Sequence, residues 1–299
     1  MSLVIDGTSC FESDIRHCDE CTEIERDGKK YYQYRLLIAS VVNIKTHDTI
    51  VIGIEPILNQ DGSEKNDCEM NAAKRLLQRL YSYNPWMRYV VIADGLYTAA
   101  PIIQQIKSYK WEAIITLTDE TMEIFEVANS YFGDKERDFF YSEKFENNSV
   151  WFCDTSLAMF WSSLKSQEIY VAKRIVEEID KTGQVKQGSM STSFFISTIP
   201  LSKTNIKQIS RLHRARWGIE NTTINNLKNR YNMKHIFVYQ STALVWIFAS
   251  LAMNLHVIFM LRNHIRLKNK ITQESFAKHL AQSLGGLMMF TEIFLLLEN

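Results

Sequence analysis

The sequence predicts an α/β protein built on one mixed sheet with helices packed against it. Strand-like and helix-like segments follow one another as three strands, a helix, a strand, a helix and a strand, an order that bundles and sandwiches lack. The 299 residues are 46% hydrophobic and 12% aromatic, which is ordinary for a chain that buries a core and excludes intrinsic disorder. Only 11 glycines and 4 prolines leave little linker sequence, so we expect one body with insertions.

Three strand-like segments open the chain. Residues 2–9 read as a short apolar strand that ends in Asp-Gly-Thr, and a cysteine-rich turn follows. β-Branched and aromatic residues are concentrated in Tyr31–Val42 and again in Thr49–Ile57, as is typical of strands. Because the connections are short, we expect an antiparallel meander.

A helix and a crossover follow the meander. Asn66 can cap a helix with Glu69 three residues later, and apolar positions then recur at helical spacing. The apolar runs Tyr89–Ala93 and Ala113–Leu117 read as buried strands on either side of a helix over Ala100–Tyr109. Strand, helix and strand in this order imply a parallel crossover.

The rest of the chain divides into a β-rich insertion and a helical part. Residues 120–200 hold short strand-like segments, whereas helical periodicity returns at about 205–229 and 242–262. We therefore expect a first part of the core at 1–119, the insertion at 120–200, and a helical part at 201–299 that completes the core and closes on an apolar tail.

The zero net charge conceals an uneven charge distribution. Between Lys203 and Lys234 there are eight basic residues and one acid, whereas residues 112–146 carry ten acids and three bases. A basic stretch of this kind can follow a phosphate backbone, although it is more often the solvated face of a helix. Charge alone therefore makes nucleic acid one candidate partner.

Compartment and membrane signals favour a cytosolic protein. Five cysteines are an odd number, and Met-Ser-Leu-Val-Ile-Asp lacks the basic and apolar regions of a signal peptide. Ser241–Leu261 is long and apolar, but Asn254 and His256 interrupt it, and each is unfavourable in lipid without a partner. We expect a buried core helix there, with a membrane-associated protein as the alternative.

Four possible zinc ligands occur close together, namely Cys10, His17, Cys18 and Cys21. Cys18 and Cys21 form one Cys-x-x-Cys pair of suitable spacing. Structural zinc usually takes two such pairs, so thiols in a strand connection are the simpler interpretation and a zinc site is the other.

Asp6 and Asp94 each follow an apolar run. If their strands are neighbours, the two backbones lie about 4.8 Å apart, and carboxylates that close favour a divalent cation. The alternative is that each aspartate caps a turn, because Asp-Gly is favoured turn chemistry. A third carboxylate nearby would favour the metal site.

A third carboxylate lies on the predicted late helix. At about 100° per residue, His213, Arg216 and Glu220 fall within about 60° of one another, with Lys228 about 80° beyond Glu220. Arg216 and Glu220 alone could equally be an ordinary ion pair at i, i+4. Trp217, between them, could stack on a base or fill the core.

Several ordered motifs belong to one pattern. They are Val4-Ile-Asp-Gly-Thr, Lys65-Asn-Asp-Cys-Glu-Met-Asn-Ala-Ala-Lys-Arg, Ile92-Ala-Asp-Gly-Leu-Tyr, Phe194-Phe-Ile-Ser-Thr-Ile-Pro, Arg214-Ala-Arg-Trp-Gly-Ile-Glu-Asn and Leu227-Lys-Asn-Arg-Tyr-Asn-Met-Lys-His. Together they resemble the aspartate motifs, the intervening helix and the C-terminal signature of bacterial insertion-sequence transposases of the DDE type. The resemblance extends from Val4 to about His256.

The resemblance implies a ribonuclease H-like fold, in which a mixed five-stranded sheet has flanking helices and a β-rich insertion before the last catalytic helix. Asp6, Asp94 and Glu220 would hold two Mg²⁺ ions, for which Mn²⁺ can substitute. The implied reaction is cleavage of DNA at the element's ends and transfer of the freed 3′ hydroxyl. The implied partners are transposon ends, target DNA and a second subunit in a DNA-bound homodimer, with no membrane partner. The implied location is the nucleoid in the cytoplasm.

The family's Tyr-Arg-Glu-Lys signature aligns with His213, Arg216, Glu220 and Lys228, which makes His213, Arg216 and Lys228 the implied DNA contacts. Two departures stand out. His213 replaces the tyrosine, and Lys228 follows Glu220 by eight residues rather than seven.

The family's N-terminal domain, which recognises the element's ends, has no counterpart before Asp6, and we expect it to be absent. Non-specific, salt-sensitive DNA binding is then expected rather than sequence-specific recognition. The alternative to an active enzyme is an inactive, truncated transposase remnant that only binds DNA.

Overall fold

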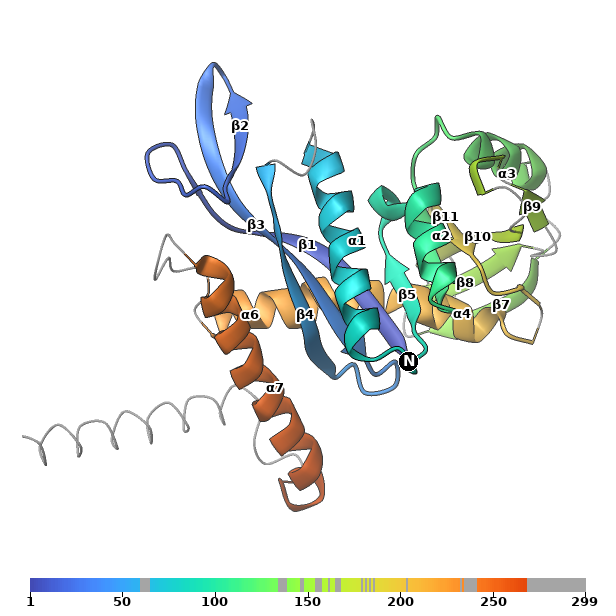
Figure 1. Ribbon diagram of the computed structural model, residues 1–299. Helices are drawn as coiled ribbons and strands as arrows, with labels where there is room; N and C mark the ends of the chain where they lie inside the picture. Colours follow the sequence, from blue (N-terminus) through green and yellow to red (C-terminus); the bar gives the residue numbers. More distant parts are fainter. Residues whose placement is uncertain are drawn as a thin grey trace, which may run out of the picture.

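In the computed structural model, the described residues are 1–267 without 60–64, 134–138, 146–147, 154–157, 161, 165–167, 179, 181, 183, 185, 203, 232 and 234–240. They form one sheet with helices on both faces (Figure 1). The expected apolar tail lies outside the described residues, as do Lys203 and Lys234 at the ends of the basic stretch.

Five strands form one half of the sheet, in the order β4-β3-β1-β5-β6. They are β1 (Ser2–Ser13), β3 (Lys29–Val42), β4 (Thr49–Ile57), β5 (Val90–Ala93) and β6 (Glu112–Leu117). Strand β3 is antiparallel to both β1 and β4, whereas β5 is parallel to β1 and β6 is parallel to β5. The predicted meander, the predicted parallel crossover and the α/β class are therefore confirmed.

The first strand is longer than predicted, and one strand was missed. β1 continues past Asp6 to Ser13 because it stays paired with β3, so Asp6 is not at a strand end. β2 (Thr22–Arg26) forms a hairpin with β3 through Asp27 and Gly28, both of which have positive φ. A two-residue Asp-Gly loop is a strong hairpin signal, and it was available in the sequence.

The segment predicted as a β-rich insertion extends the same sheet. Its strands are β7 (Phe139–Phe145), β8 (Asn148–Cys153), β9 (Ala158–Phe160), β10 (Glu168–Glu178) and β11 (Ser191–Ser197). Strand β11 is antiparallel to β6, and β10 continues the sheet beyond β11. Within the described residues the sheet thus has eleven strands rather than five. A helix that was not predicted, α3 (Glu123–Gly133), precedes these strands.

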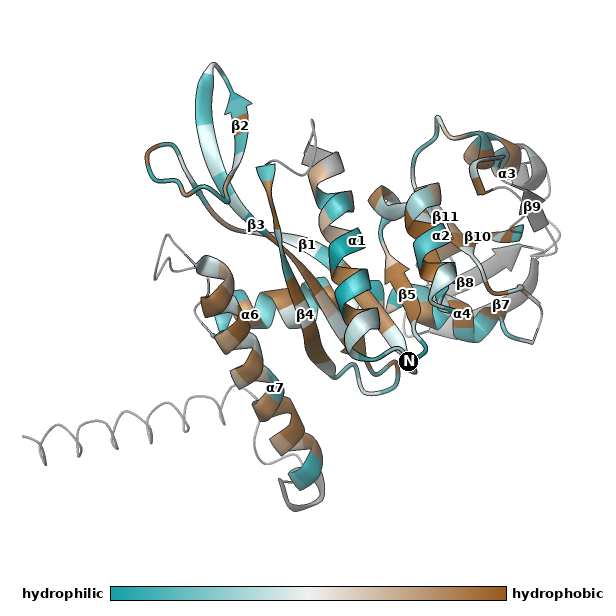
Figure 2. Cartoon of the chain, viewed as in Figure 1, coloured by the Kyte–Doolittle hydropathy of each residue, from teal (hydrophilic) through white to brown (hydrophobic). Residues whose placement is uncertain are grey.

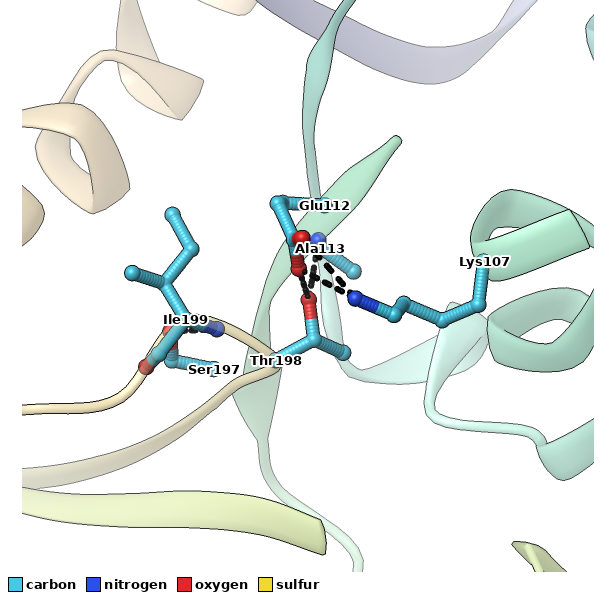
Figure 3. A network of polar contacts seen from close by, with 6 residues as sticks. All are labelled: Lys107, Glu112, Ala113, Ser197, Thr198 and Ile199. Carbon is cyan, nitrogen blue, oxygen red and sulfur yellow. Dashed lines mark hydrogen bonds and ion pairs between the residues drawn. The ribbon is translucent and has the colours of Figure 1, made fainter. Parts of the chain in front are cut away.

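A polar network joins the residue that follows β11 to α2 and β6, which belong to the first part of the chain (Figure 3). The Lys107 ammonium donates to Glu112 at 2.8 and 2.9 Å, and the Thr198 hydroxyl donates to the same carboxylate. The Ala113 N–H donates to the Thr198 hydroxyl at 2.8 Å. These bonds join the end of α2 (Ala100–Ser108), the start of β6 and the residue after β11.

The helices cover opposite faces of the sheet with separate apolar clusters. α1 (Lys65–Tyr83) and α2 cover one face, and α4 (Ile206–Arg214) begins the cover of the other. Side chains alternate between the faces along β1, so Leu3 belongs to the first cluster and Val4 to the second. Because α1 begins at Lys65, Asn66 lies inside its first turn rather than at its cap.

The single helix predicted for 205–229 is interrupted. After α4 come a short α5 (Arg216–Gly218), a π-helix η4 (Ile219–Ile224) and α6 (Asn225–Asn229). Buried Ile219, Ile224 and Leu227 keep these segments against the sheet. A continuous α-helical wheel therefore does not describe the residues between Arg216 and Lys228.

Helix α7 (Thr242–Leu267) packs on β4 and is less buried than predicted. The Asn254 amide bonds both the N–H and the C=O of Val51, at 2.9 and 2.7 Å, and His256 Nδ1 lies 3.0 Å from the Tyr231 hydroxyl. Only 28% of its most apolar window is buried, and Figure 2 shows that most of the helix is hydrophobic. It is the one described helix long and apolar enough to cross a membrane, which is weak evidence for a span.

Candidate active site

Asp6 and Asp94 belong to neighbouring parallel strands, Asp6 within β1 and Asp94 directly after the end of β5. β1 and β5 pair Leu3 with Val91 and Val4 with Ile92, the last pair of this ladder, and each aspartate lies two residues beyond it. Adjacent strands are about 4.8 Å apart. β5 ends at Ala93, so Asp94 lies outside the ladder, whereas Asp6 remains paired with Ile38 of β3.

Charges from α1, α5 and η4 act on this pair. The pKa of Asp6 is raised to about 7, mainly by burial and then by the Asp94 carboxylate; the Arg216 guanidinium opposes this rise, and Glu69 and Glu220 add smaller repulsions. Burial likewise raises the pKa of Asp94, against the Leu96 N–H and Arg216. Residues far apart in the sequence thus form one acidic cluster with one arginine at its side.

Each aspartate is followed by a glycine that permits a close contact. A Cβ on Gly7 would lie 2.5 Å from Glu69 Oε1, and a Cβ on Gly95 would lie 1.8 Å from Thr118 Oγ1. Neither glycine has a positive φ. The turn interpretation holds only for Asp94, whose Oδ1 accepts the Leu96 N–H at 3.1 Å and caps the short helix η2 (Gly95–Tyr97).

Glu69 is a residue of this site that the sequence analysis assigned to a helix cap. It is 7% exposed, forms an ion pair with Arg35 of β3, and accepts the Tyr97 hydroxyl at 2.8 Å. Its carboxylate therefore touches both aspartate-bearing segments, through Gly7 and through Tyr97. The available signal was its position four residues before Ala73, which puts an acid on the apolar face of α1.

Arg216, Glu220 and Lys228 come from the interrupted helical segment. Arg216 is half-buried, and its charge acts on both aspartates, whereas Glu220 is exposed in the first turn of η4. Burial raises the pKa of Cys10, and the Lys228 ammonium opposes that shift, which places Lys228 near Cys10 on β1.

The π-helix η4 lies in the interval between Glu220 and Lys228. Eight residues of α-helix would rotate Lys228 about 80° from Glu220, whereas seven would rotate it only about 20°. A π-turn closes its hydrogen bond one residue later than an α-turn and so accommodates one extra residue. The eight-residue spacing with η4 is therefore equivalent to a seven-residue spacing in an uninterrupted α-helix.

His213, expected as a DNA contact, is buried, whereas Trp217, which could have filled the core, is exposed. His213 is 7% exposed, its Nε2 lies 2.9 Å from Thr116 Oγ1, and its ring stacks on Phe195. Burial, with Arg174 and Arg216, lowers its pKa to about 3, so the imidazole is neutral. Trp217 is 50% exposed, which contradicts the interpretation of this residue as core.

No three His, Cys, Asp or Glu side chains within the described residues are close enough to share one metal ion. The proposed zinc ligands do not converge, because His17 stacks on Tyr32 while only Cys18 and Cys21 are together, with their Sγ atoms 3.2 Å apart. The Asp6 and Asp94 pair differs, since Mg²⁺ commonly takes one or two carboxylates and completes its shell with water and substrate phosphate. Two repelling, oxygen-bearing side chains fit such an ion.

The chain is similar to a protein family and to solved structures. A family model described as "Transposase DDE domain" matches residues 4–255. No curated protein matches the chain. Among solved structures, the "Crystal structure of the NurA nuclease from Sulfolobus solfataricus" matches with 8% identity, 78% of this chain, 81% of that chain and a TM-score of 0.37.

Proposed function

This chain belongs to the transposase DDE domain family, and from that premise we propose that it is a catalytic core that cleaves and joins DNA strands. The observation that supports this most strongly is that Asp6 and Asp94 come from the neighbouring parallel strands β1 and β5 and that the Asp94 carboxylate raises the pKa of Asp6, while the Arg216 charge acts on both from more than a hundred residues away and Glu220 acts on Asp6. The five-strand order β4-β3-β1-β5-β6, in which only β3 runs in the opposite direction, supports a ribonuclease H-like fold.

Asp6, Asp94 and Glu220 are the residues that would hold divalent metal ions. Two Mg²⁺ ions would activate the attacking oxygen and stabilise the leaving oxygen at the scissile phosphate. Water attack breaks the bond between phosphorus and the 3′ oxygen and leaves a 3′ hydroxyl. Attack of that hydroxyl on a second phosphodiester then exchanges one such bond for another, so the joining step needs no energy-rich co-substrate.

The remaining side chains would position DNA. Arg216 and Lys228 are proposed phosphate contacts on either side of Glu220, and exposed Trp217 is available to stack on a base. His213 is proposed as a positioning residue, since its bond to Thr116 and its stacking on Phe195 fix α4 on the sheet. A homodimer on DNA and a location at the nucleoid follow from the family and are proposed with it.

The inactive remnant that only binds DNA is the less favoured function. All three carboxylates are present, and the burial of Asp6 against Asp94 is unfavourable in a chain with no use for a cation. Likewise, the bonds of Asn254 to Val51 favour a packed role for α7 over a membrane role.

The test is metal binding and DNA nicking by the wild-type chain and by Asp94→Asn. We expect the wild type to bind Mn²⁺ by calorimetry and to nick DNA with it, and the variant to lose both because one ligand is gone. Asp119→Asn is the matched control, since Asp119 is exposed beyond β6 and its loss should change neither property. Nicking that persisted unchanged in Asp94→Asn would refute the assignment.

A further inference from the structure

A cationic pocket lies beside the acidic cluster. Its volume is about 220 Å³, and it lies between the strands β6, β10 and β11 and the helices α4 and α5. Arg174, Arg214 and Arg216 line it together with the hydroxyl-bearing Ser191 and Ser193, and its described lining includes no acid. A concave site with three guanidinium groups and no carboxylate is suited to an anion.

Arg174 shows that this pocket is more than a basic surface. It lies on β10 directly opposite Ser193 of β11, is 5% exposed, and its Nε has no hydrogen-bond partner within the described part of the chain. Burial, with the repulsion of Arg214, lowers its pKa to about 10, so it stays charged at neutral pH. A buried cation without a counter-charge is costly to the fold, and a ligand that supplies the charge would offset that cost.

Arg216 connects the pocket to the proposed catalytic carboxylates. It lines the pocket and also lowers the pKa of Asp6 and of Asp94. An anion in the pocket would therefore lie one side chain away from the reacting phosphate. The narrow volume admits one small group rather than a duplex, which is wider than the whole pocket.

We propose that this pocket binds one phosphate group of a DNA strand whose neighbouring phosphate reaches Asp6 and Asp94, with Arg174 as its principal contact. This inference rests on the proposed function, because the substrate is then DNA. The Arg174 guanidinium can donate two parallel hydrogen bonds to phosphate oxygens, and Ser193 can donate from the facing strand. An internal phosphodiester and a terminal phosphate share this chemistry.

The first experiment measures thermal unfolding in sodium phosphate and in sodium chloride of equal ionic strength, without metal. We expect phosphate to raise the Tm of the wild type and not that of Arg174→Met. Without phosphate the variant should be at least as stable as the wild type, because methionine removes an uncompensated buried charge. Lys173→Met removes the same charge from the next residue of β10, which lies over Phe194 outside the pocket, and should keep the phosphate response.

The second experiment measures, by fluorescence anisotropy, the affinity for one single-stranded oligonucleotide that carries either a 5′ phosphate or a 5′ hydroxyl. Arg174→Met should weaken binding about tenfold and reduce the slope of log affinity against log salt by about 0.7. Equal loss for both oligonucleotides identifies an internal phosphodiester, whereas loss confined to the phosphorylated one identifies a terminal phosphate. Unchanged affinity for both, or the same loss in Lys173→Met, would overturn the proposal.

The two proposals can fail separately. The phosphate response needs neither metal nor strand cleavage, so Asp94→Asn should retain it. A wild type that responds to phosphate but never nicks DNA would refute only the proposed function. If the wild type nicks DNA and needs Asp94 to do so, but phosphate does not raise its Tm or raises the Tm of Arg174→Met equally, only the proposed phosphate site would be refuted.

Discussion

The carboxyl group of Asp6 lies among other acids in a largely buried position. Burial and the repulsion of Asp94, Glu69 and Glu220 outweigh the attraction of Arg216, which is why its pKa rises to about 7. A bound cation would relieve this repulsion. The groups that suit the site to metal therefore reduce the stability of the metal-free chain, as is common at functional sites.

Asp6→Asn should stabilise the metal-free chain, and more at pH 8 than at pH 5. Because the folded pKa of Asp6 is above its unfolded value of about 3.8, the wild type loses stability as the pH rises from about 4 to about 7. Asparagine does not ionise and avoids this loss. Urea unfolding with a chelator at both pH values measures the difference. A gain that did not depend on pH would show that the carboxylate is not the cause, and Asp119→Asn should give none.

At the scale of the element, η4 decides which way Lys228 faces. The helical segment after Arg216 must keep Ile219, Thr223, Ile224 and Leu227 buried while it carries an eight-residue interval. The Thr223 hydroxyl also donates to Thr49 Oγ1 of β4 at 2.8 Å, which fixes the middle of η4. The π-helix therefore accommodates the extra residue, and Lys228 is not rotated away from Glu220.

Deleting Asn221, which is exposed in η4, should be tolerated, whereas inserting one alanine after it should not. The deletion leaves a seven-residue α-helical interval with the lysine on the same face, but the insertion rotates it by about 100°. We expect DNA affinity within about twofold for the deletion. For the insertion, the salt slope should fall by about 0.9, one phosphate contact on duplex DNA. Anisotropy over a salt series measures both, and equal losses would contradict the role of η4.

At the scale of the whole molecule, the Asn254 side chain joins α7 to the sheet. The Asn254 amide bonds both backbone groups of Val51 across 203 positions of the sequence, while buried Trp246 and Met253 supply apolar contact. Many other apolar side chains of α7, such as Phe248 and Leu255, are exposed, on a helix that Figure 2 colours as largely hydrophobic. The attachment therefore depends on a few contacts along β4.

Asn254→Leu should reduce the free energy of unfolding by about 1–3 kcal/mol, because it leaves the N–H and C=O of Val51 without partners. Urea unfolding monitored by tryptophan fluorescence measures the change. Asn263→Leu is the control on the same helix, since Asn263 is half-buried and its side chain donates to the Phe259 carbonyl within the helix. A similar cost for both substitutions would show that the contact to Val51 has no special weight.

Local pattern in the sequence determined most of the elements. Apolar runs and helical spacing predicted β3 to β6, α1, α2 and α7 within a few residues, because each of these segments buries one face or both. The ordered motifs predicted the family, which the match over residues 4–255 confirms. The roles of Asp6, Asp94 and Glu220 remain predictions, although the structure brings their charges together.

Only the tertiary structure decided how the sheet is extended, which residues surround the aspartates and how the helix predicted for 205–229 is interrupted. Glu69 and Arg174 are charged residues in positions that local pattern assigns to a helix cap and to a strand, and their burial depends on partners far along the chain. His213 and Trp217 are four residues apart on the predicted helix, so their wheel positions could not show that one is buried and the other exposed. Sequence periodicity reports the face that a residue occupies within its own element, whereas burial and pKa depend on what the other elements place against that face.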